Sequence, residues 1–84
     1  MAVRRAVIIH TDTITLGALL KWAQVAATGG QAKEMIRRGL VKVNGVIERR
    51  RARQIRPGDV VEVGPHVLEV RREEAGEARA AAGG

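Results

Sequence analysis

The chain lacks cysteine, serine, phenylalanine and tyrosine, and Trp22 is the single large aromatic among its 84 residues. Without cysteine there is no disulfide framework, no thiolate nucleophile and no thiolate-ligated metal. Threonine provides every hydroxyl group, and His10 and His66 have no supporting cluster of metal ligands in the sequence. We therefore expect no catalytic residue, no metal and no cofactor.

Long hydrophobic runs are also missing. No uninterrupted apolar run exceeds about five residues, whereas a membrane helix needs about 20, and residues 1–10 contain no stretch long enough for a signal peptide. We expect a soluble cytoplasmic protein with one domain over residues 1–72. Residues 73–84 are rich in Ala, Gly and Glu, have little apolar surface to bury, and are predicted to form a flexible tail.

Positive charge is plentiful and concentrated in one segment. The net charge is +6, yet residues 33–56 contain nine Lys or Arg and only Glu34 and Glu48 as acids, so this segment alone carries +7. Arginine outnumbers lysine by 12 to 3, and its planar fork of donors suits phosphate. A polyanion such as nucleic acid is the expected partner; a solvated face that serves only solubility is the alternative.

Hydrophobic spacing predicts two helices. Residues 3–9 favour a strand, and after a loop Thr15 is a typical N-cap. The residues that then form one apolar helix face are Leu16, Leu19, Leu20 and Ala23, with Trp22 half-buried on its flank. Thr28 and Gln31 match a capping box for a second helix with an apolar stripe of Ala32, Met35 and Ile36, which ends at Gly39. About two residues are expected to join the two helices as a hairpin.

The second half of the chain predicts strands. Asn44-Gly45 between two short β-branched segments is a strong hairpin signal. Residues 57–59 indicate a turn, and residues 60–63 and 66–70 favour two further strands. The fold class is therefore α+β, a helix hairpin packed on a small sheet.

Two basic groups are candidates for binding. On the second helix, Lys33 and Arg37 share one flank, while Glu34 and Arg38 are spaced to form an ion pair. Residues 29–30 are glycines at the helix start, where a phosphate could approach the backbone; a tight turn between helices explains them equally well. The second group comprises the arginines of residues 49–53. With Trp22 as the sole aromatic we expect no base-stacking platform, so the expected partner is a folded nucleic acid recognised by its backbone phosphates and shape.

Four segments resemble the ribosomal protein S-four type RNA-binding domain. They are residues 14–21 (ITLGALLK), 28–33 (TGGQAK), 39–45 (GLVKVNG) and 56–63 (RPGDVVEV). The resemblance covers about residues 14–70. It is strongest to the small stand-alone bacterial members of the family. It implies two helices on a small, bent, mostly antiparallel sheet (the αL RNA-binding motif). It also implies a monomer bound to structured RNA, commonly rRNA or ribosomal particles. Many relatives have Arg and Asp at the start of the first helix, where this chain has Thr15, Leu16 and Gly17.

The resemblance carries over a set of RNA-binding residues that agrees with the charge pattern. They are Thr28, Gly29, Gly30, Gln31, Lys33, Arg37, Arg38, Lys42, Arg49, Arg50, Arg51 and Arg53. Two alternatives from other classes remain. Gly83-Gly84 is typical of a ubiquitin-like sulfur carrier, and a protein-interaction module would instead present an exposed apolar patch.

Overall fold

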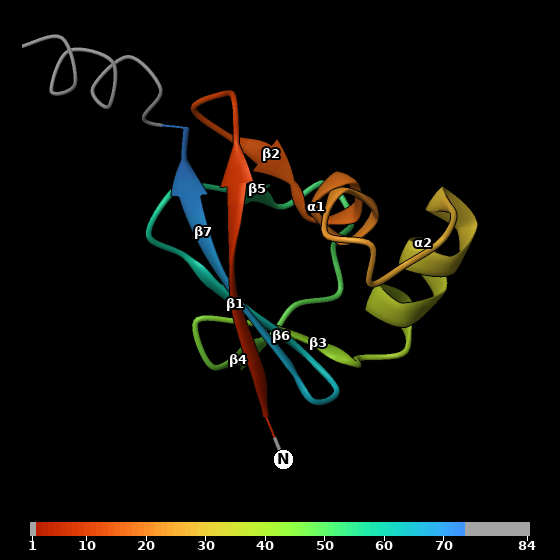
Figure 1. Ribbon diagram of the computed structural model, residues 1–84. Coiled ribbons are helices and arrows are strands. Elements are labelled where there is room, and N and C mark those ends of the chain that lie inside the picture. Colours follow the sequence, from red (N-terminus) through yellow and green to blue (C-terminus); the bar gives the residue numbers. More distant parts are fainter. Residues whose placement is uncertain (1, 74–84) are drawn as a thin grey trace, which may run out of the picture.

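The computed structural model describes residues 2–73, which form two helices and two sheets (Figure 1). In chain order the elements are β1 (Val3–Ile9), β2 (Ile14–Thr15), α1 (Leu16–Trp22), α2 (Gly29–Arg37), β3 (Val41–Val43), β4 (Val46–Ile47), β5 (Gln54–Ile55), β6 (Val60–Val63) and β7 (His66–Arg72). The predicted α+β class is confirmed. None of the described residues forms a helix long and apolar enough to cross a membrane.

The main sheet has five strands in the order β1-β7-β6-β3-β4. The first and last strands in sequence, β1 and β7, pair in parallel, and the other three pairings are antiparallel. The short strands β2 and β5 form a separate antiparallel pair beside the start of α1. Together with the bonds from the Leu16 and Gly17 N–H groups to the Arg53 and Arg51 carbonyls, this small sheet holds the chain that follows β4 against the first helix.

Both helices lie on one side of the main sheet (Figure 1). The predicted apolar face of α1 is fully buried, as are Ala32 and Ile36 of α2, while Met35 is partly buried. Alternate residues of the strands complete this core, among them Val41, Val61 and Leu68. The residues between them point to the opposite face, which carries Lys42, Glu62 and Glu69 together with apolar residues such as Ile8 and Val60.

The first helix ends earlier than the sequence suggests. We expected about two residues between the helices, but residues 23–28 join them. Gln24 takes a left-handed φ of 60° and its N–H bonds the carbonyl of Lys21, while the N–H of Val25 bonds that of Leu20. This is a Schellman ending with glutamine where glycine is usual. The second helix ends in the same way at Gly39, as predicted.

The predicted turns are confirmed. Val43 pairs with Val46 across a two-residue loop in which Asn44 and Gly45 both have positive φ, 51° and 85°, as a type I′ hairpin requires. The last strand extends through Arg72, beyond the predicted residue 70. The predicted tail lies outside the described residues apart from its first residue, Glu73.

Candidate nucleic-acid interface

The start of α2 is built by Thr28. Its hydroxyl oxygen accepts the N–H of Gln31 at 3.1 Å, which satisfies one of the amides that a helix start leaves without a partner. The Gln31 side chain reaches back to the N–H of Ala27 at 2.5 Å, one residue before the N-cap amide that a standard capping box uses. The predicted cap is thus confirmed with a shifted second bond, and Gly29 and Gly30 are left exposed in the first turn.

One flank of α2 carries two cationic side chains in line with its first residue. Gly29, Lys33 and Arg37 follow one another at spacings of four, so they share a flank of the helix. The expected Glu34–Arg38 ion pair is wrong: Glu34 instead accepts Arg37 at 2.9 Å, and this hydrogen bond lowers the pKa of the Glu34 carboxyl. Residues three and four apart are both neighbours on a helix, and here the nearer one is used. Arg38 consequently remains free of an ion pair among residues 2–73.

The arginine-rich segment between β4 and β5 is held by Glu48. Glu48 is 9% exposed and is the one buried polar or charged residue among residues 2–73. Its carboxylate accepts the Arg53 guanidinium at 2.7 Å and the Arg50 N–H at 3.1 Å. The bond from Arg53, with smaller help from Arg50, lowers the pKa of Glu48 against the opposing effect of burial. A buried carboxylate thereby fixes the course of an otherwise self-repelling segment.

Arg51 lies against the start of α1. The N–H of Gly17 donates to the Arg51 carbonyl at 3.1 Å, and a Cβ added at Gly17 would lie 2.7 Å from the Arg51 Cγ. Only glycine admits this side chain so close to the helix. Arg51 and Ala52 then line one hollow together with Thr15, Gly17, Ala18, Lys21 and Gly29. The predicted basic segment and the start of α2 thus meet at one place.

Arg49 lies against the other end of α2. A Cβ added at Gly39 would be 2.7 Å from a terminal nitrogen of the Arg49 guanidinium. The segment that follows β4 therefore touches the C-terminal end of α2 through Arg49 and shares a hollow with its N-terminal end through Arg51. We call Lys21, Gly29, Lys33, Arg49 and Arg51 the helix-side basic surface. In the described part of the chain, its four cations make no ion pair.

Lys42 lies elsewhere. Its strand neighbours Val41 and Val43 are buried on the helix side, so Lys42 is exposed on the opposite face of the sheet. There it is paired in register with Glu62 and Ile47. The structure does not bring Lys42 together with the helix-side basic surface.

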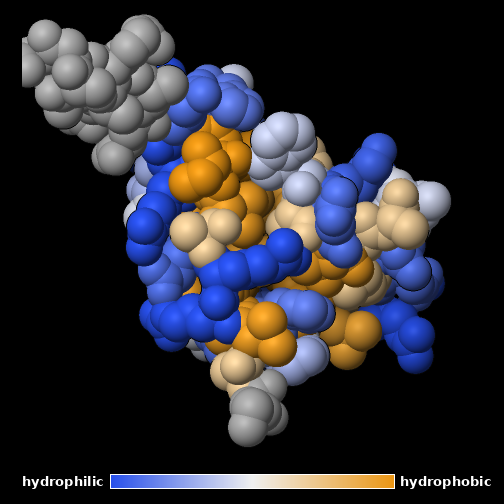
Figure 2. All heavy atoms as spheres, viewed as in Figure 1, coloured by the Kyte–Doolittle hydropathy of each residue, from blue (hydrophilic) through white to orange (hydrophobic). Residues whose placement is uncertain are grey.

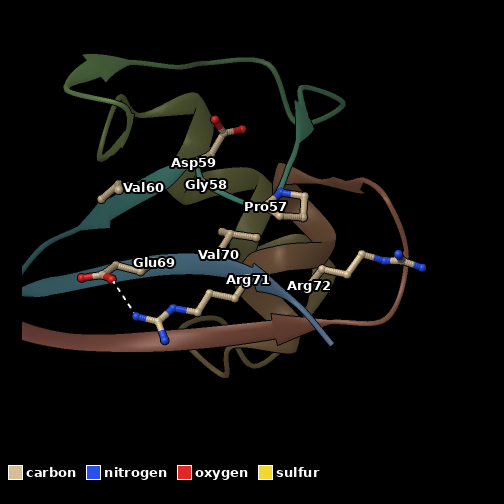
Figure 3. Close-up of a pocket in the computed structure, with 8 residues that line it drawn as sticks. All are labelled: Pro57, Gly58, Asp59, Val60, Glu69, Val70, Arg71 and Arg72. Carbon is tan, nitrogen blue, oxygen red and sulfur yellow. Dashed lines mark hydrogen bonds and ion pairs between the residues drawn. The ribbon is translucent and has the colours of Figure 1, made fainter. Parts of the chain in front are cut away.

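A second hollow lies on the far side of the sheet and has a different character (Figure 3). Asp59 and Glu69 line it, and Glu69 pairs with Arg71 at 3.3 Å and also with Arg4. Arg72 points away from this hollow and pairs with Asp12 at 3.3 Å. Arg71 and Arg72, which line this hollow, are each paired with a carboxylate, whereas Arg49 and Arg51 are not paired with one among residues 2–73.

Sequence reasoning missed Lys21 as a site residue. It lies off the apolar stripe of α1, and only the packing of the two helices brings it to Gly29, where its Cδ is 4.0 Å from a Cβ built on that glycine. A signal was present: the end of one helix in a hairpin necessarily lies near the start of the next.

The diglycine of residues 83–84, which suggested a sulfur carrier, lies outside the described residues.

The chain belongs to the S4 domain family, whose match covers residues 7–71. It is 46% identical over 55 residues to "Probable ribosome maturation protein RlbA" of Bacillus subtilis (strain 168). That similarity spans 66% of this chain and 78% of the relative.

Proposed function

We propose that this chain is a non-enzymatic RNA-binding protein that holds structured RNA by its phosphates, with ribosomal RNA or ribosomal particles as its target. Membership of the S4 domain family supports the RNA-binding role, and the name of the Bacillus subtilis relative supports a role connected with the ribosome. Phosphate binding extends beyond both of these and rests on the arrangement of charge.

The observation that carries the proposal is the hollow shared by Arg51, Lys21 and Gly29, which no carboxylate lines. Unpaired cations held close together repel one another, and a polyanion removes that cost. The first amides of α2 add a partial positive charge at the same place. Lys33, four residues after Gly29, extends the surface along the helix.

The experiment is a salt titration of affinity. The full chain is titrated with a folded RNA hairpin by fluorescence anisotropy at several potassium chloride concentrations. If roughly five to eight phosphates are neutralised, log K against log salt has a slope of about −4 to −7. A flat response would overturn the proposal, because contacts that release no counterions are not phosphate contacts.

Contacts to phosphates also predict weak sequence dependence. Hairpins with the same fold and different stem sequences should bind with similar affinity, because backbone contacts carry little sequence information. A strong preference for one stem sequence would instead require contacts to base edges.

A further inference from the structure

Trp22 has a fixed orientation and yet remains exposed. Its Nε1–H donates to the Ile8 carbonyl at 2.6 Å, at the open edge of β1. The His10 ring meets it in a T-shaped arrangement, with centroids 5.7 Å apart and planes at 81°. Even so, Trp22 is 53% exposed. The Nε1–H bond thus holds the indole in place while about half of its surface stays open to a partner.

The exposed ring lines a hollow that is next to the helix-side basic surface. Ile14, Ala18, Lys21 and Trp22 line this hollow. Ala18 and Lys21 also line the neighbouring hollow of Arg51 and Gly29. The two hollows are therefore neighbours along α1, and Ala18 and Lys21 line both of them.

The surroundings of Trp22 are apolar on one side and cationic on the other. Ile8 is 41% exposed, and Figure 2 shows apolar surface over the C-terminal end of β1 among hydrophilic side chains. Neither hollow beside α1 is lined by a carboxylate. A flat apolar ring next to an unpaired ammonium group suits a nucleotide, which has a planar base joined to an anionic phosphate.

We propose that Trp22 stacks on one unpaired nucleobase of the bound RNA while Lys21 contacts the adjoining phosphate. This inference rests on the proposed function and adds to it: the target has a bulged, flipped-out or terminal nucleotide beside the segment held by its phosphates. A single aromatic cannot form a platform for several bases, but it accommodates one. A protein side chain is the less favoured occupant, because the cation and its continuity with the basic surface would serve no purpose for it.

The test uses two RNA hairpins that differ in one base. The first has a single bulged adenosine, and the second has an abasic residue at the same position, so the phosphates and the stem are unchanged. Trp22 is the only tryptophan, so its fluorescence reports on stacking without a label. The adenosine hairpin should quench Trp22 and bind about tenfold more tightly than the abasic one.

Variants separate stacking from folding. W22F keeps an aromatic ring and should keep most of the preference for the adenosine hairpin, whereas W22A should bind both hairpins equally. K21A should weaken binding of both hairpins by a similar factor. If W22A does not fold, the comparison of the two hairpins on the unaltered protein still decides the matter.

The failures of the two proposals are distinguishable. Equal affinity for both hairpins with unchanged Trp22 fluorescence overturns the base site and leaves phosphate binding intact. Binding of neither hairpin at low salt overturns the proposed function, and the base site with it.

Discussion

Two groups of arginines in this molecule differ in whether a carboxylate neutralises them. In the first group, Arg4 and Arg71 share Glu69 on the face of the sheet opposite the helices, and Arg72 at the end of β7 pairs with Asp12. On the helix side, Arg49 and Arg51 pair with no carboxylate in the described chain and instead lie against glycine backbone. The first arrangement cancels charge locally, and the second preserves it.

The difference indicates which arginines are available to a partner. A paired guanidinium must give up its carboxylate before it binds a phosphate, so little is gained in the exchange. An unpaired guanidinium held by packing loses no such bond and less conformational entropy. The number of arginines therefore overstates the proposed binding surface, which we restrict to those without a carboxylate partner.

The largest expected effect on RNA affinity comes from removing two cations of the helix-side basic surface. K21A/R51A should weaken binding of a folded RNA hairpin by about ten- to a hundredfold, because each lost phosphate contact is a charge-assisted hydrogen bond. The salt slope should become shallower by roughly 1.4–1.8. Anisotropy titrations at several salt concentrations measure both quantities.

R4A/R71A is the matched control, since it removes the same charge from the far side. We expect it to change affinity by less than about threefold, through the small loss of long-range attraction. Equal losses from the two double variants would mean that net charge, and not the helix-side basic surface, determines binding.

A second expected effect concerns the stability contributed by Glu48 and Glu69, the carboxylates that pair with arginines on the two sides of the molecule. The lowered pKa of Glu48, due first to the Arg53 hydrogen bond, means that folding favours the ionised form. Its contribution to stability is therefore complete above the ordinary glutamate pKa of about 4.3 and is lost as the pH falls through the lower folded value. E48Q should reduce the free energy of unfolding at pH 7 by about 1–3 kcal/mol and flatten its dependence on acid pH.

E69Q provides the comparison for Glu48. The pKa of Glu69 is also lowered, first by its hydrogen bond with Arg4 and then by Arg71. These ion pairs of Glu69 lie on the surface, where water screens them. E69Q should therefore lower the free energy of unfolding by less than E48Q does. Chemical denaturation at pH 7 and at pH 3 measures all three proteins. A larger loss in E69Q would contradict the assignment of Glu48 as the residue that holds the arginine segment.

The features that were predictable from sequence are local. The apolar face of α1 follows from spacing alone, and Asn44-Gly45 needs only its own two residues to specify the hairpin. The early end of α1 was not predictable because Gln24 adopts a conformation usually signalled by glycine. β2 and β5 are two residues each, too short for an alternation to show.

The candidate site likewise has some features that local sequence predicts and others that depend on long-range contacts. The basic segments could be read from composition, and the Thr28 cap from a motif. The meeting of Arg51 with Gly17 depends on a long-range backbone contact from Gly17 to the loop before β5, which no local pattern encodes. The choice of Arg37 over Arg38 by Glu34 was likewise open, because both are close enough on a helix.

The smallest expected effect tests whether the position of one guanidinium matters. Gly39 and Gly64 both have left-handed φ, 75° and 59°, but a Cβ at Gly39 would meet the Arg49 guanidinium whereas nothing lies within 4 Å of one at Gly64. G39A and G64A should each destabilise the fold by about 1–2 kcal/mol, the cost of an L-residue in that conformation.

RNA affinity should separate these two variants. G39A displaces the Arg49 guanidinium and should weaken hairpin binding by about two- to tenfold, the value of one hydrogen bond, while G64A should bind as the unaltered protein does. Adding R49A to G39A should cause no further loss, because the contact is already gone. If G39A and G64A bind equally well, Arg49 reaches the phosphate from more than one position, and its packing against α2 serves the fold and not the RNA.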